Sequence, residues 1–140
     1  MALFTPPSSG TWTPTFTVAT PGNFSITVTP IGFYVRTGSL VYAQFDISPS
    51  SFTHSTASGT VTITGLPFPV ATGKEAWGAM QWSGITKASY TNIVCRATGG
   101  GSLLDLLAMG SGVANTTLLI GDFPTAGSVR LKGSVSYLAA

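Results

Sequence analysis

The sequence predicts an all-β protein, an antiparallel β-sandwich of jelly-roll-like form. Three observations lead to this prediction. Apolar residues recur at every second position in several segments, which is the period of a strand with one buried face. Clusters of Gly, Pro, Asn and Ser separate these segments at short intervals, as in sandwiches and barrels. Threonine, which favours the half-buried surface of a sheet, occupies many of the alternate positions.

The first half of the chain contains four alternating segments, and each is predicted to be a strand. In one of them Phe24, Ile26 and Val28 share one face, while Ser25 and Thr27 share the other. The four segments lie at residues 12–18, 24–28, 40–47 and 59–64, and turn sequences at 20–23, 30–32, 37–39 and 49–51 separate them.

The second half alternates most clearly at residues 128–137, which we predict to be the closing strand. Strands are also expected at 76–84 and at 92–97. The segment 103–109 has the composition of a helix, but it is short and glycines flank it, so it is predicted as either a strand or a single helical turn.

The length of 140 residues predicts one domain. We assign residues 11–140 to the sandwich and residues 1–10 to an extended N-terminal arm, because the latter do not alternate. Leu3 and Phe4 are the apolar anchors of this arm. In a multimer such an arm lies on a neighbour, and in a monomer it frays.

The charge content is unusually low. Only 7% of the residues are Asp, Glu, Lys or Arg, whereas soluble domains contain about 25%. The chain is nevertheless 44% hydrophobic and 11% aromatic, which argues against disorder. Interface cores are depleted in Lys, Glu and Asp. The composition therefore indicates a protein whose surface partly faces other subunits.

Several partners are not expected. The six Lys and Arg residues are scattered rather than gathered in a patch, so no nucleic-acid partner is predicted. No apolar run reaches the roughly 18–20 residues of a membrane-spanning helix, and the N-terminus lacks the features of a secretory signal. The one cysteine cannot form a disulfide within the chain.

The sequence offers little for catalysis, and no enzymatic activity, metal or cofactor is predicted. His54 is interpreted as an exposed loop residue and Cys95 as a small buried hydrophobic residue. One His and one Cys cannot supply the four ligands of a structural zinc site. A glycosidase would need two carboxylates facing each other, and the four in this chain are scattered.

Trp77 and Trp82 are the candidates for ligand stacking. They are five residues apart, so on one uninterrupted strand they face opposite sides. If exposed, such aromatic side chains suit sugar rings; if buried, which is the favoured interpretation, they anchor a core or an interface. Their opposite orientation implies that one fills the core and the other faces a partner or ligand.

Three motifs, taken together, resemble a β-rich module of bacteriophage structural proteins. They are GTWTPTF at 10–16, IGFYVRTGSLVYAQFDI at 31–47 and GTVTITGLPF at 59–68. The resemblance covers the first half of the chain, and in the second half only the closing strand GSVRLKGSVSYL matches.

The resemblance implies a jelly-roll-like sandwich that forms homotrimers. Such modules occur in fibre tips, and similar folds serve as capsid decoration proteins. By this likeness Trp12, Phe16 and Tyr34 are architectural residues. Leu66 and Phe68 would close the end of the sandwich while the neighbouring prolines fix the corner.

The function predicted from these observations is that of a non-enzymatic virion protein made in the host bacterium. The leading expectation is a trimeric capsid decoration, or cement, protein that binds the major capsid protein through Leu3 and Phe4. It is favoured because Met1 stands only eleven residues before Trp12, which leaves no room for a fibre shaft. The alternative is a receptor-binding tip of a tail or head fibre that recognises a host surface glycan or protein. A carbohydrate-active enzyme is the third hypothesis.

Overall fold

The computed structural model describes residues 7–140 and confirms an all-β, antiparallel fold. The strands, in chain order, are β1 (Ser8–Thr11), β2 (Thr15–Thr20), β3 (Ser25–Thr27), β4 (Ile31–Thr37), β5 (Leu40–Ile47), β6 (Ser51–Thr53), β7 (Ser58–Thr64), β8 (Ala76–Ser83), β9 (Asn92–Ala97), β10 (Leu103–Gly110), β11 (Val113–Thr117) and β12 (Arg130–Leu138). A short 3₁₀ helix, η1 (Ile120–Asp122), precedes β12.

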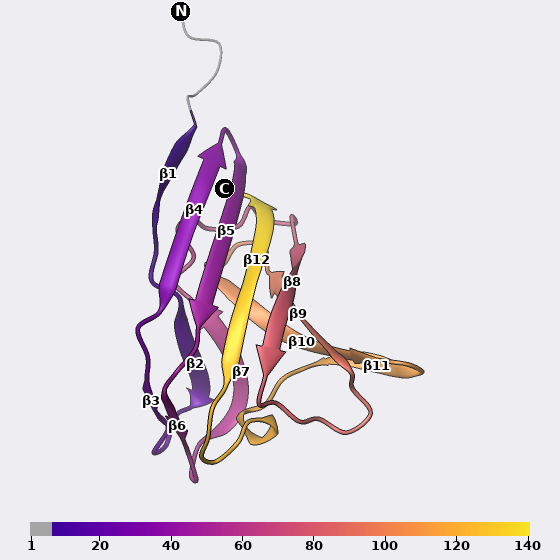
Figure 1. Cartoon of the computed structure of the whole chain (residues 1–140). Helices are drawn as coiled ribbons and strands as arrows, with labels where there is room; N and C mark the ends of the chain where they lie inside the picture. The colour runs from indigo at the N-terminus through magenta and orange to yellow at the C-terminus, as the bar shows by residue number, and fades with distance from the viewer. Residues whose placement is uncertain (1–6) are drawn as a thin grey trace, which may run out of the picture.

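One curled sheet makes both layers of the sandwich (Figure 1). Its strand order is β1-β4-β5-β12-β8-β9-β10-β7-β2, with β11 paired to β10. The strand β8 belongs to both layers: residues 80–83 pair with β12, and residues 76–79 pair with β9. We call β1-β4-β5-β12 the front leaf and β9-β10-β7-β2 the back leaf. A separate pair, β3 and β6, lies at one end.

Gly78 marks the place where β8 passes from one leaf to the other. A β-carbon at this position would overlap the carbonyl oxygen of Ser134 on β12 and lie 3.0 Å from Sγ of Cys95 on β9. Only a residue without a side chain allows these three strands to come so close. The bend of the sheet therefore depends on a glycine.

The core fills the space between the leaves. Phe52 lies in an aromatic cluster, with its ring centroid 5.5 Å from those of Phe16 and Phe123 and 5.3 Å from that of Phe24. Trp12 is buried, and its indole Nε1 donates hydrogen bonds to the carbonyl oxygens of Gln44 and Phe33 at 3.2 and 3.3 Å. The buried faces are the ones that alternation predicts for β2, β5, β7 and β12.

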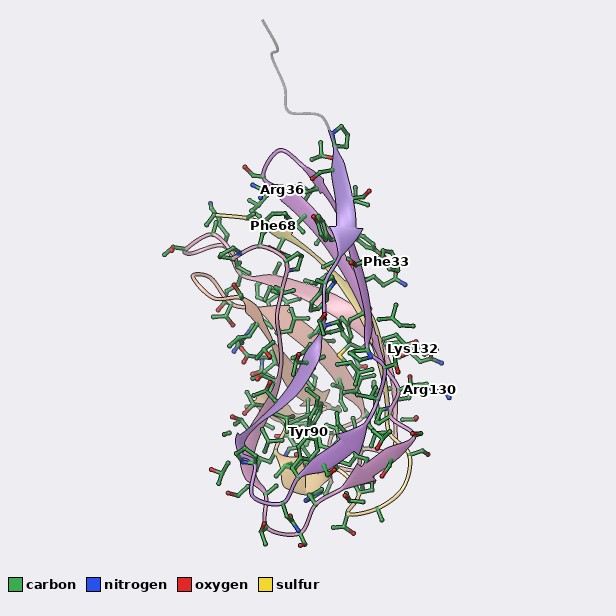
Figure 2. All side chains as sticks on the ribbon, turned by 90° about the vertical axis from the view of Figure 1, so that its left-hand side faces the viewer. Phe33, Arg36, Phe68, Tyr90, Arg130 and Lys132 are labelled. Carbon is green, nitrogen blue, oxygen red and sulfur yellow. The ribbon has the colours of Figure 1, made fainter. Side chains whose placement is uncertain are left out.

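The segment after β7 closes one end of the sandwich, as the resemblance implied. Leu66 is buried, and the half-buried Phe68 packs edge-to-face on Tyr34 with 5.1 Å between ring centroids. The Arg36 guanidinium lies 4.4 Å from the Phe68 ring centroid (Figure 2). Tyr137 donates a hydrogen bond of 2.9 Å from its hydroxyl to the Phe68 carbonyl oxygen. These contacts make the motif architectural.

Some expectations need correction or refinement. Residues 8–10, assigned to the arm, belong to β1, which pairs with β4 from Ser8↔Arg36 to Thr11↔Phe33. The segment 103–109 is a strand within β10, because it pairs with β9 on one side and β7 on the other. Residues 1–6, including Leu3 and Phe4, lie outside the described residues.

Candidate subunit interface

The outer face of the front leaf is unusually apolar. Strand β4 turns Ile31, Phe33 and Val35 outward, and β5 turns Leu40 and Tyr42 to the same side. Trp77 on β8 and Leu138 on β12 extend this surface. Seven of the nine exposed large apolar side chains in residues 7–140 belong to it. We call these seven residues the outer apolar face.

The pairing of strands explains why these side chains share one surface. Val35 is the partner of Tyr42 across β4 and β5, and Phe33 is the partner of Gln44. Leu138 pairs with Leu40 across β12 and β5. Because directly paired residues point to the same side of a sheet, the alternation along each strand builds a continuous patch. Phe33 points away from the core on this side in Figure 2.

A shallow groove of about 610 Å³ lies at the rim of the outer apolar face. Trp77, Leu40 and Leu138 line its apolar part, and Lys74 and Glu75 line its polar part. Trp77 is 61% exposed. An indole left this open is typical of a side chain that fills a pocket in a partner or supports a ligand.

The charges near this face lie at its two ends, with Lys74 and Glu75 at the groove and the others toward the start of β12. Lys132 and Asp46 form an ion pair of 3.5 Å, and Arg130 lies two residues before Lys132. Lys132 and Arg130 point to the same side as Phe33 in Figure 2. The part of the face between these two ends, around Phe33, Val35 and Tyr42, carries no charged side chain.

Trp77 and Trp82 face opposite sides of β8, as their spacing predicts. Trp77 is exposed because β8 turns its odd-numbered residues outward, which agrees with the expectation that one of the two fills the core and the other faces a partner or ligand. Trp82 is partly buried and packs against the core. The two residues therefore belong to different surfaces.

His54 is not the exposed loop residue that the sequence suggested. It is only 8% exposed, its ring packs edge-to-face on Phe52, and its Nε2 lies 3.3 Å from the carbonyl oxygen of Phe123. The surrounding residues are polar in sequence, but the loop folds back over the aromatic cluster. His54 is thus part of the core, and no carboxylate bonds to it among the described side chains.

The carboxylates are mostly engaged with cations. Asp105 accepts hydrogen bonds from Arg96 at 3.0 Å and Thr98 at 2.8 Å, and Asp122 forms an ion pair of 3.0 Å with Lys87. Within residues 7–140 no cluster of His, Cys, Asp and Glu could hold a metal ion. No helix in the same range is long and apolar enough to cross a membrane.

Cys95 is buried, as predicted, and its environment disfavours the thiolate. Burial raises the pKa of the thiol from 9.0 to about 11. The group therefore contributes stability that is fully present below pH 9 and is lost as the pH rises through about 11. A shift of this size corresponds to about 2–3 kcal/mol.

We expect the free energy of unfolding to fall between pH 9 and about 11, and to fall less in Cys95→Ala. Burial also raises the pKa of Tyr137, but that residue is present in both proteins and drops out of the difference. Urea unfolding of both proteins across this pH range measures the difference between their free energies of unfolding. A difference between the two proteins that does not change with pH would contradict the account.

Five residues of the outer apolar face were not predicted as site residues from the sequence: Ile31, Phe33, Val35, Leu40 and Leu138. A signal was present, because residues 33–35 and 40–42 are apolar at consecutive positions and thus on both faces of their strands. Alternation identifies the one buried face of a strand, and it does not by itself reveal a second apolar face.

The chain matches no protein-family model and no curated protein. In fold it is similar to the crystal structure of Dettilon tailspike protein (gp208), with a TM-score of 0.65 and 19% sequence identity. The match covers 92% of this chain and 23% of the tailspike chain, so this chain spans about a quarter of that protein's length. The likeness shows that residues throughout this chain adopt a fold also found within a tailspike protein.

Proposed function

We propose that the chain is a structural β-domain of a bacteriophage virion and that it works as a homo-oligomer, a trimer by its resemblance to phage structural modules. The outer apolar face carries this proposal. A contiguous apolar patch on a soluble protein marks an interaction surface. The fold, shared with part of a tailspike protein, supports a place in the virion.

A second copy of the chain is the partner that this face suits best. Its central part, around Phe33, Val35 and Tyr42, carries no charge that would recruit an oppositely charged protein. Lys132 and Asp46 neutralise each other near one end, and Lys74 and Glu75, of opposite sign, lie at the other. Identical faces can therefore approach one another without strong repulsion. Closed rings of identical subunits are also the usual way in which a chain buries such a patch.

A place in a tail fibre or tailspike is the more favoured of two locations. The structural likeness is to a tailspike protein, and the chain is similar to about a quarter of it. The second candidate is capsid decoration, which the sequence motifs also suggest. In that case Leu3 and Phe4 remain the predicted contacts with the major capsid protein.

The number of copies in the purified virus particle tests this proposal. Quantitative mass spectrometry against the major capsid protein should give a small number of copies, in a multiple of three. A ratio close to that of the capsid subunit would instead favour the decoration role. Absence from the particle would overturn the proposal of a virion protein.

A further inference from the structure

A second cavity, of about 150 Å³, lies on the opposite side of β8 from the outer apolar face. Its aromatic walls are Trp82 and Tyr90, and its most buried lining residues are Ile93 and Ala108. The loop between β8 and β9, residues 84–91, forms the mouth and contributes Thr86 and Lys87 among the lining residues. The cavity thus lies within one chain.

The loop is held firmly in place. The amide N–H of Thr86 donates a hydrogen bond to the carbonyl oxygen of Asp122 at 2.9 Å. The amide N–H of Thr91 donates one to the carbonyl oxygen of Met109 at 3.0 Å. The Tyr90 hydroxyl donates to the carbonyl oxygen of Ala114 at 3.0 Å. Ser89 has a φ of 69°, a left-handed conformation that is uncommon for residues other than glycine. Backbone outliers of this kind cluster at functional sites.

The cavity is lined by both apolar and polar groups, and its net charge is close to neutral. The Lys87 ammonium lies 3.0 Å from Oδ2 of Asp122, so its charge is compensated, and 5.8 Å from the Tyr90 ring centroid. Asp122 is held in turn by the amide N–H of Leu119 at 2.9 Å. Among residues 7–140 no protein acceptor takes the indole N–H of Trp82, and no buried polar side-chain atom lacks a partner. The indole N–H of Trp82 therefore has no acceptor among the described residues.

We propose that this cavity binds one neutral sugar ring, a hexopyranose unit of a glycan. The C–H face of a pyranose matches the electron-rich face of an aromatic ring. The Trp82 indole N–H, the Thr86 hydroxyl and the Lys87 ammonium are donors for its hydroxyl and ring oxygens. The volume is below the roughly 300 Å³ of sites for drug-sized ligands, which limits the site to a single ring.

The groove beside Trp77 is the less suitable sugar site. It is wide and shallow, and it adjoins the face proposed to pack against another subunit. The cavity at Trp82 is instead lined by residues of a single chain, so it does not depend on the proposed oligomer. The proposal of sugar binding can therefore be wrong while the proposal of subunit assembly is right, and the reverse.

Two-dimensional NMR of the indole N–H groups tests the site. Trp12, Trp77 and Trp82 give three signals, which Trp→Phe variants assign. Addition of methyl glucoside, galactoside or mannoside should shift the Trp82 signal with a dissociation constant on the order of 1 mM for at least one sugar, because a single-ring contact is weak. The Trp12 and Trp77 signals should stay in place.

A matched pair of variants separates binding from general effects. Thr86→Phe is expected to fill the mouth of the cavity and abolish the shift, while Thr86→Ser keeps both the space and the hydroxyl. Thr86 is exposed, so both variants should fold. The proposal is overturned if no sugar shifts the Trp82 signal, if Thr86→Phe leaves the shift intact, or if only the Trp77 signal responds.

Discussion

Phe33→Glu is expected to convert the proposed oligomer into folded monomers. Phe33 is 41% exposed on β4, between Ile31 and Val35, and it does not belong to the core. Burying such a side chain contributes about 1.5–3 kcal/mol, and burying an unpaired carboxylate in its place costs several kcal/mol more. The dissociation constant of each subunit contact should therefore rise by at least about a hundredfold. Sedimentation velocity at micromolar concentration measures the change.

Val113→Glu is the matched control for this experiment. Val113 is 38% exposed, close to the value for Phe33, but it lies on β11, away from the outer apolar face (Figure 1). We expect this variant to keep the mass of the unmodified protein. If Phe33→Glu also kept that mass, or if both variants dissociated alike, the outer apolar face would not be the subunit interface.

Gly78→Ala is expected to destabilise the fold by about 3 kcal/mol or more. The added β-carbon would overlap the backbone oxygen of Ser134, and Cys95 lies on the other side, so the clash cannot be relieved by rotating a side chain. To make room, β8 would have to move away from β12, and the bend that joins the two leaves would open. Urea unfolding, monitored by tryptophan fluorescence, measures the loss.

Gly121→Ala supplies the control for Gly78→Ala. Gly121 lies in η1, and a β-carbon there would meet no atom within 4 Å. Its φ is not in the left-handed region, so alanine is compatible with the backbone. The unfolding midpoint of this variant should lie close to that of the unmodified protein. Equal midpoints for both alanine variants would contradict the close packing of β8 on β12.

The longer strands and their core faces were predicted from the sequence, because both follow from local alternation, whereas the short strands β1, β6 and β11 were not. Phe16, Leu66 and Val135 are buried as expected. The opposite orientation of Trp77 and Trp82 also followed from their spacing alone. In these cases the relevant information is contained within a few consecutive residues.

Features that depend on distant strands were missed. Strand β8 belongs to both leaves because Gly78 packs closely against Ser134. Ser134 is 56 positions later in the chain, so local sequence does not reveal this contact. His54 was misinterpreted because Phe123, its hydrogen-bond partner, comes from a segment 69 residues away. The outer apolar face required the pairing of β4, β5 and β12, which alternation within one strand does not reveal.

The molar mass of the unmodified protein in solution tests the central claim most directly. Light scattering during size-exclusion chromatography should give three times the 14.4 kDa of one chain, at micromolar concentration and moderate salt. The mass should change little with added salt, because the proposed contact is apolar rather than ionic. A mass of a single chain under these conditions would contradict the account of the outer apolar face as a subunit interface.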